Sequence, residues 1–319
     1  MKKIKEIVIF CGILSIAVIL AVDKRYSVAV TDGISLWFSG VLPVLFPYFF
    51  ITAMLSSMKV TAKIAIKLNP LTTRLFRTGG VTGYALLMSV ISGYPVGAKL
   101  VSDLKSGGLI SDTEAVRASA FCSTASPTFL IAGVGSITFG NIKLGVLLCV
   151  TNLISTFLTG IVFSFYKRKD KPLPAKAIDI KTADNILYDG VYSAVISSLT
   201  VGGIITLFFT LTEILLSIGV LSPFITLIQS LTGSKAVGEG AMLGLFECTK
   251  GLKALANGEI GALTLPVASS ICGFGGLSVI AQSTAYLKRA KIKTTAFVLA
   301  KLLTAVISFG IGLLFTLFL

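Results

Sequence analysis

Long apolar stretches alternate along this chain with short polar and basic segments. A helix needs about 20 mainly apolar residues to cross a bilayer. Seven stretches meet that length: residues 4–22, 34–56, 113–139, 143–166, 193–220, 260–287 and 294–319. We expect each of them to be a transmembrane helix.

Two further apolar stretches, residues 81–104 and 238–256, are broken near their middle. The interrupting residues are Gly93, Tyr94, Pro95 and Gly97 in the first stretch, and Glu247, Thr249, Lys250 and Gly251 in the second. Glycine, proline and polar groups halfway across a bilayer are typical of a re-entrant hairpin buried in protein. The pattern therefore predicts an all-α polytopic membrane protein, with about seven transmembrane helices plus two re-entrant helical hairpins.

Composition supports this class and excludes others. Apolar residues make up 54% of the 319 residues and charged residues only 13%, about half the share of a soluble domain. Histidine is absent, which excludes histidine-ligated zinc and any triad with an imidazole base. The five cysteines lie inside apolar runs and do not predict a disulfide framework. We expect neither a cofactor nor a metal.

The net charge of +14 indicates orientation rather than nucleic-acid binding, because the basic residues cluster between apolar runs. Lipid phosphates are the expected partners. All clusters fall on one side if both broken stretches return to the side they entered, which predicts a cytoplasmic amino terminus and a carboxyl terminus on the opposite side. The clusters are Lys2, Lys3 and Lys5; Lys59, Lys63, Lys67, Arg74 and Arg77; Lys167, Arg168, Lys169, Lys171, Lys176 and Lys181; and Lys288, Arg289, Lys291 and Lys293.

The order of elements predicts an internal repeat of opposite orientation. Each copy contains a span, an amphipathic stretch, a broken hairpin, a span with a polar interruption and a last span. Three crossings per copy place the second copy upside down relative to the first, as in secondary transporters. Weak identities at a shift near 150, such as Gly97 with Gly251 and Cys122 with Cys272, agree with this order. The expected organisation is an anchor helix in residues 1–33, kept rather than cleaved as a signal peptide, a first repeat in 34–166, a basic cytoplasmic linker in 167–189 and a second repeat in 190–319.

Four polar interruptions are the candidate solute site, because an opened helix can present free amides, carbonyls and hydroxyls to a solute. The alternative is that glycine and serine serve only close helix packing. The paired occurrence of the interruptions favours a solute pathway. The candidate residues are Ser92, Gly93, Tyr94, Pro95, Gly97, Ser123, Thr124, Ser126, Glu247, Thr249, Lys250, Ser269, Ser270, Gly273 and Ser278.

Charged residues inside the second hairpin leave two interpretations open. Glu247 and Lys250 are three residues apart and could neutralise each other. Alternatively, Glu247 carries a proton or meets the solute, because intramembrane charges are usually functional. Glu213 is a weaker candidate. Lys99 and Lys253 are expected to extend from the hairpin mouths towards polar surroundings.

The strings SGYPVGAKL, SDTEAVRASAFCSTASPTF and SSICGFGGLSV resemble the nucleoside-recognition, or Gate domain, family. The closest resemblance is to its sporulation integral membrane proteins of the YlbJ type, from about residue 36 to the end. The resemblance implies a spore-formation transporter that passes dipicolinic acid from mother cell to forespore, and places it in the membrane around the forespore. Ser123 and Thr124 depart from the family pattern, in which an Asn is common at that turn.

Three classes of function follow. The first is a secondary transporter of a small polar, anionic solute, with a nucleoside as the alternative solute. No Walker motif is present, so ATP hydrolysis within this chain does not drive it. The second is a non-transporting assembly factor of the spore envelope. The third, an intramembrane enzyme using Cys122 or Cys272, lacks a histidine base, and we expect the chain not to be an enzyme. A homo-oligomer is left open.

Overall fold

The computed structural model describes residues 24–318, except 57, 59 and 174–184, together with a few isolated residues between 7 and 18. Every regular element in this part of the chain is a helix. Most of the first expected span, residues 4–22, lies outside the described residues, as do Lys2, Lys3, Lys5, Lys59, Lys176 and Lys181.

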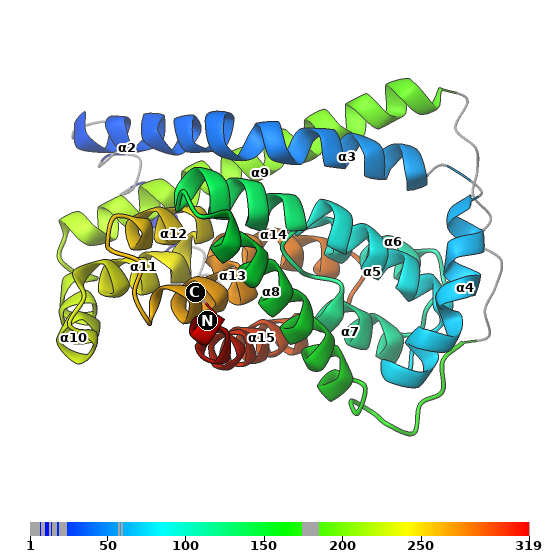
Figure 1. The fold of residues 1–319 in the computed structure, drawn as a ribbon. Helices are drawn as coiled ribbons and strands as arrows, with labels where there is room; N and C mark the ends of the chain where they lie inside the picture. Colours follow the sequence, from blue (N-terminus) through cyan, green and yellow to red (C-terminus); the bar gives the residue numbers. More distant parts are fainter. Residues whose placement is uncertain are drawn as a thin grey trace.

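The first half of the chain forms a long helix, a crosswise helix, a helical hairpin and two more long segments (Figure 1). Its elements are α2 (Lys24–Ser35), η1 (Leu36–Val41), α3 (Leu42–Ser56), α4 (Val60–Leu75), α5 (Gly80–Ser92), α6 (Val96–Ser106), α7 (Asp112–Phe121), η2 (Phe129–Thr138) and α8 (Ile142–Phe163). Helices α2, η1 and α3 run on without a break from Lys24 to Leu55.

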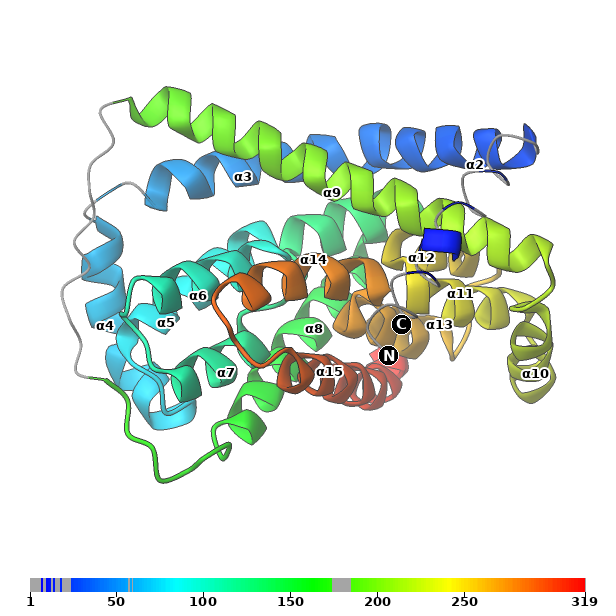
Figure 2. The ribbon, with the colours of Figure 1, turned by 180° about the vertical axis from the view of Figure 1, so that it is seen from behind.

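The second half has the same order of elements. They are α9 (Ile186–Ser217), α10 (Ser222–Thr232), α11 (Lys235–Phe246), α12 (Cys248–Ala256), α13 (Thr264–Phe274), α14 (Gly276–Arg289), α15 (Thr294–Phe315) and η3 (Thr316–Phe318). Helix α4 and the open end of hairpin α5–α6 lie at one end of the molecule, whereas α10 and the open end of hairpin α11–α12 lie at the other (Figures 1 and 2).

Five helices in the described part of the chain are long and apolar enough to cross a membrane: Lys24–Leu55, Ile142–Phe163, Ile186–Ser217, Thr264–Arg289 and Thr294–Phe318. The expected span 113–139 is not one helix, because it opens between α7 and η2. Two helices begin earlier than expected, at Lys24 rather than residue 34 and at Ile186 rather than residue 193. Each has 32 residues and is about 48 Å long, so its ends extend beyond a bilayer core of about 30 Å and can carry charge.

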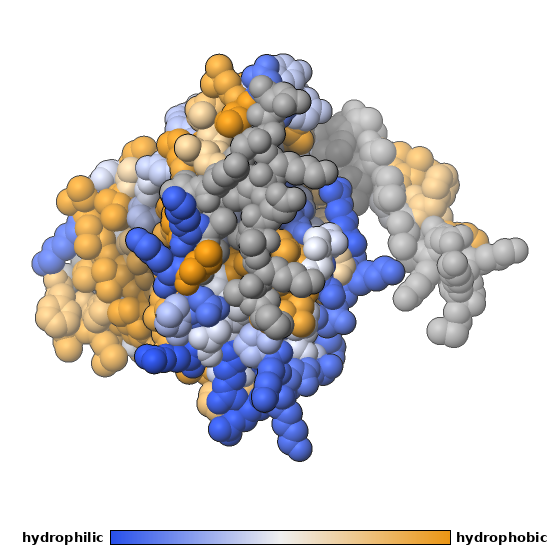
Figure 3. Space-filling view, turned by 90° about the vertical axis from the view of Figure 1, so that its right-hand side faces the viewer, coloured by the Kyte–Doolittle hydropathy of each residue, from blue (hydrophilic) through white to orange (hydrophobic). Residues whose placement is uncertain are grey.

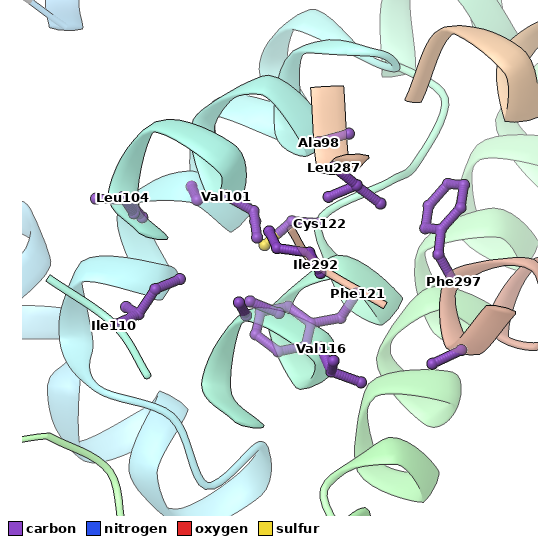
Figure 4. Packing of buried hydrophobic residues seen from close by; sticks show 14 of the residues in the cluster. Ala98, Val101, Leu104, Ile110, Val116, Phe121, Cys122, Leu287, Ile292 and Phe297 are labelled. Atoms are coloured by element: carbon purple, nitrogen blue, oxygen red, sulfur yellow. The ribbon is translucent and has the colours of Figure 1, made fainter. Parts of the chain in front are cut away.

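The two halves share one hydrophobic core rather than forming separate bundles. Side chains of α6 and α7 pack against side chains of α14 and α15, with the Phe76 and Phe121 rings stacked 4.1 Å apart. Figure 4 shows this cluster, with Val101, Phe121, Leu287 and Phe297 among its labelled members. The long helices α2–α3 and α9 pack mainly against each other, and they form a layer on one side of the remaining helices (Figures 1 and 2).

The basic segments of the described chain lie at the end where α4 is found (Figure 1). Figure 3 looks onto this end and shows hydrophilic side chains gathered there, with hydrophobic side chains on its flank. The basic residues are Lys63, Lys67 and Arg74 of α4, Arg77 after it, Lys167, Arg168, Lys169 and Lys171 after α8, and Lys288, Arg289, Lys291 and Lys293 around the turn between α14 and α15.

Candidate functional site

The first broken helix opens between Phe121 and Pro127. Helix α7 ends at Phe121, and a new helix starts after Ser126, whose hydroxyl accepts a hydrogen bond from the Phe129 amide at 3.2 Å. Proline suits the first position of a helix, because its missing N–H would have no partner there. The sequence SPTF thus stops one helix and caps the next.

The second broken helix changes direction at two glycines. Gly275 and Gly276 have φ angles of 82° and 80°, a region that residues with a side chain rarely adopt. The Gly275 amide donates to the Ile271 carbonyl at 2.7 Å and closes α13, and α14 starts directly afterwards. Two adjacent glycines therefore separate the halves of this long helix.

The two hairpins turn at corresponding residues. Gly93 follows the last residue of α5, and Glu247 follows the last residue of α11, as expected from the sequence. Gly93 has a φ of 78°. Glu247 instead has extended backbone, and its carboxylate accepts hydrogen bonds from the Lys250 amide at 2.7 Å and the Thr249 hydroxyl at 3.3 Å. The carboxylate therefore caps α12, where the positive end of the helix dipole favours it.

These four segments meet around a small cavity of about 40 Å³. That volume holds a few water molecules and is far below the several hundred Å³ of a drug-sized ligand site. Predicted residues that line it are Gly93, Tyr94, Ser126, Glu247, Thr249 and Ser278. The other lining residues are Ala125, Phe129, Cys248, Val279 and Gln282 from the broken segments, and Val41, Leu45, Val201 and Ile205 from the α2–α3 and α9 layer.

Several predicted residues lie beside this cavity rather than in its lining. In the first hairpin, the Ser92 hydroxyl bonds to that of Thr52, and Gly97 packs against the Cys122 carbonyl. Pro95 lines a second cavity.

The remaining predicted residues support the broken helices. Thr124 accepts a hydrogen bond from the Asn152 amide of α8. Ser123 offers its carbonyl to Lys301 at 3.1 Å. In the second half, Ser269 and Gly273 pack against α15, and Ser270 lines another cavity.

The predicted pairing of Lys250 with Glu247 is wrong. The Lys250 ammonium lies 2.6 Å from the Glu213 carboxylate and 3.3 Å from the Phe209 carbonyl, both on α9. Only the backbone of Lys250 meets the Glu247 carboxylate. Three residues of helical spacing would allow a side-chain pair, but Glu247 precedes the first turn of α12 and its carboxylate is already used as the cap.

Gly251 also differs from the expectation that it faces an unwound helix. A Cβ added there would lie 2.3 Å from the Gly244 Cα, so this glycine allows α11 and α12 to cross closely within their own hairpin. Gly97 does face an unwound segment, because its added Cβ would lie 1.6 Å from the Cys122 carbonyl oxygen. The two glycines match in sequence and differ in what they contact.

Two polar residues at the site were missed by the sequence analysis. Gln282 of α14 lines the cavity, and Lys301 of α15 is buried behind Tyr94 with its ammonium 5.4 Å from the ring centre. A charge within the apolar run 294–319 was a signal that could have identified Lys301.

The central cavity adjoins further cavities on the side of the basic end. The second cavity, of about 200 Å³, shares Val201 and Gln282 with it and also contains Lys99 and Arg289. A third cavity shares Phe49, Val96 and Lys99 with the second and reaches Asp189 at the start of α9. Lys99 thus lies within this series, with its ammonium 3.5 Å from the Ser193 hydroxyl, whereas Lys253 is exposed.

Comparison with known proteins places the chain among sporulation membrane proteins. No solved structure matches it. A family model described as the cyanobacterial TRADD-N associated 2-transmembrane domain matches residues 116–173, from α7 to the segment after α8. The chain is also 31% identical over 302 residues to the sporulation integral membrane protein YlbJ of Bacillus subtilis (strain 168), which covers 86% of this chain and 73% of that protein. With the apolar helices described above, these similarities establish an integral membrane protein, and the chain belongs to the family of the sporulation integral membrane protein YlbJ.

Proposed function

We propose that this chain is a secondary transporter of a small anionic solute that acts during spore formation. The observation that carries the proposal is the meeting of two hairpin turns and two broken helices, drawn from both halves of the chain, at one buried cavity. Discontinuous helices that meet inside the membrane are the usual substrate site of transporters built from inverted repeats. We interpret the two halves as such a repeat, and the hairpins α5–α6 and α11–α12 as re-entrant.

An anionic solute fits the helix ends at this cavity. Ser126 caps the helix that starts at Pro127, and Ser278 lies in the first turn of α14, so two helix amino termini point their amides towards the same space. Helix amino termini favour anions, because their N–H groups are unpaired and the helix dipole is positive there. The Glu247 carboxylate lies at a third amino terminus, so a second anion requires that Glu247 be protonated or displaced.

Dipicolinic acid is the solute we favour, because the chain belongs to a sporulation family and the site suits carboxylates. A cavity of about 40 Å³ does not admit it, so this arrangement corresponds to a closed state that must open to load the solute. We propose that loading uses the cavities with Lys99 and Arg289, which continue from the site towards the basic end. By the positive-inside rule we assign that end to the cytoplasm and the opposite end to the far side of the membrane.

Uptake into vesicles tests the proposal. Purified protein in proteoliposomes should accumulate radiolabelled dipicolinate, and unlabelled dipicolinate should compete better than a nucleoside. A Gate-type nucleoside transporter would show the reverse preference. Protein-free vesicles and vesicles with heat-inactivated protein are the controls.

A non-transporting assembly factor is the second candidate, and the small size of the cavity is the observation that favours it. In that case the hairpins are packing devices, as the close crossing at Gly251 and Gly244 would allow. Vesicles that take up neither solute under any imposed gradient would support this candidate. We propose no enzymatic role for the chain.

A further inference from the structure

Lys301 is a buried cation without a carboxylate partner among the described residues. Its side chain is 1% exposed in the middle of α15, and no acidic oxygen of the described chain lies within 4.0 Å of its ammonium. A charge at this depth in a membrane protein is costly and is retained where it has a function. Lysine 250, the other buried lysine near the site, has Glu213 as its partner.

The groups that do contact Lys301 are those that hold a bound cation. Its ammonium donates to the Ser123 carbonyl at 3.1 Å, in the open segment directly after α7, and lies 5.4 Å from the centre of the Tyr94 ring. The carbonyls at the end of a helix carry partial negative charge, and an aromatic face attracts cations. Lys301 therefore compensates the negative end of α7, while the amides of the next helix face the cavity.

The second broken helix needs no such cation. There the Gly275 amide turns back onto the Ile271 carbonyl, so backbone closes the end of α13. Cys122, at the end of α7, is not in the left-handed conformation that makes this closure. At the shift of 150 that relates the halves, the residue matching Lys301 is Thr151, which is buried and neutral. One repeat carries the cation and the other does not.

We propose that the Lys301 ammonium is a built-in cation that takes the place of a bound Na⁺ at the opened end of α7. Carbonyls of broken helices are where transporters bind coupling cations. In this chain α15 supplies the charge covalently, so neither the fold nor solute movement requires Na⁺ at this position. The part of this inference that concerns solute movement rests on the proposed function, whereas the part that concerns the fold does not.

Thermal unfolding of the purified full-length protein tests the fold part without any solute. Melting temperatures are measured in NaCl, in KCl and in choline chloride at equal ionic strength. The wild type should melt at the same temperature in all three salts. Lys301→Ala should melt several degrees lower in choline chloride and regain stability with rising NaCl in a saturable way, because a bound cation stabilises the folded state. Lys301→Arg should behave as the wild type, and Lys293→Ala, at the exposed start of α15, is the matched control.

Two results would overturn the proposal. One is a wild type that Na⁺ stabilises specifically, and this arm needs no variant to fold. The other is a Lys301→Ala protein that is as stable as the wild type, or is destabilised to an extent that Na⁺ does not change, because Lys301 would then be only a packing residue.

Dipicolinate uptake separates this inference from the proposed function. Wild-type uptake should be equal with Na⁺ or choline outside. Na⁺-dependent uptake would refute the role of Lys301 and leave transport standing. No uptake in either salt would refute transport, and the melting series would still decide what Lys301 does.

Discussion

Gly97 is the residue at which the first hairpin comes closest to the opened helix. It lies in the first turn of α6, and its neighbour across the gap is the Cys122 carbonyl, at the end of α7. Because both partners are backbone, neither can rotate away from an added side chain. The contact fixes the distance between the hairpin and the break that together form the site.

Gly97→Ala should therefore lower stability by about 1–3 kcal/mol or more and abolish dipicolinate uptake, because the added Cβ forces the hairpin away from the break. Melting temperature and uptake are measured on the same preparation. Gly203→Ala is the control, since a Cβ at that position of α9 has open space within 4 Å. Near-normal uptake by Gly97→Ala would show that this contact does not shape the site.

Glu247 combines a structural task with a charge that faces the cavity. Glu247→Gln keeps an oxygen that can accept from the Lys250 amide, and it removes the ionisable group. If the carboxylate couples solute to protons, this variant should lose acceleration by an imposed pH gradient, or stop uptake, at unchanged melting temperature. Glu239→Gln, on the outer face of the same hairpin, is the control. Uptake that stays pH-driven would reduce Glu247 to a cap, whose removal in Glu247→Ala costs about 1 kcal/mol.

Sequence reasoning located the interruptions at this scale but not all of their contacts. Glycine and proline at Gly93 and Pro127 mark where helices must open, because these residues act on the backbone itself. The partners of Lys250 and Thr124 could not be found in the same way, since they lie on α9 and α8, far along the chain. Lys301 was overlooked because its run of neighbours is otherwise apolar.

At the scale of elements, one ion pair joins the second hairpin to the α9 layer. Lys250 of α12 has a side chain only 8% exposed, whereas its partner Glu213 is 40% exposed. The two partners therefore lose different amounts of hydration when they pair. Removing the exposed partner leaves a buried charge alone, and removing the buried partner does not.

Glu213→Gln should accordingly destabilise the protein more than Lys250→Met. Stranding a buried charge costs about 3–5 kcal/mol, while loss of a partly exposed pair costs about 1 kcal/mol. The double variant should resemble Lys250→Met, and melting temperatures of all four proteins form the cycle. Equal losses from both single variants would contradict this account.

Helix α7 holds the basic end together through two buried charges that the sequence analysis did not single out. Arg117 donates to the backbone carbonyls of Arg77 at 2.6 Å and of Tyr166 and Lys167 at 2.9 Å. One turn earlier, the Glu114 carboxylate accepts from the Gly79 amide at 2.8 Å and the Leu173 amide at 3.2 Å. The two side chains thus attach both the α4–α5 turn and the segment after α8 to one helix.

Arg117→Met should cost at least about 3 kcal/mol, because several buried carbonyls lose their donor together. Limited proteolysis should then cut the segment after α8 faster than in the wild type, and the melting temperature should fall. Arg168→Gln changes an exposed arginine of that same segment and should do neither. A proteolysis rate equal to that of the wild type would mean that other contacts hold the segment.

At the scale of the whole molecule, the two halves are interlocked rather than placed side by side. Helix α8 of the first half packs against α13 and α15 of the second, where the Thr159 and Thr304 hydroxyls lie 2.9 Å apart. The order of elements was predictable, because apolar run length and charge clusters follow directly from the bilayer. The interlocking was not, since neither pattern says which helices touch.

The last prediction concerns the direction of the halves across the membrane. The basic segments, including Lys171 after α8, lie at one end of the molecule, and Gly233, between α10 and α11, lies at the other (Figure 1). In a Cys11→Ser background, whose remaining cysteines are buried, Lys171→Cys should react with an impermeant maleimide only when the cytoplasmic face is accessible. Gly233→Cys should react only from the opposite face. Neutralising Lys167, Arg168, Lys169 and Lys171 together should increase the fraction of misoriented protein, because these charges set orientation at insertion and do not contact the cavity. Labelling of both cysteines from one face would contradict the inverted arrangement, because hairpins α5–α6 and α11–α12 would then enter from the same side.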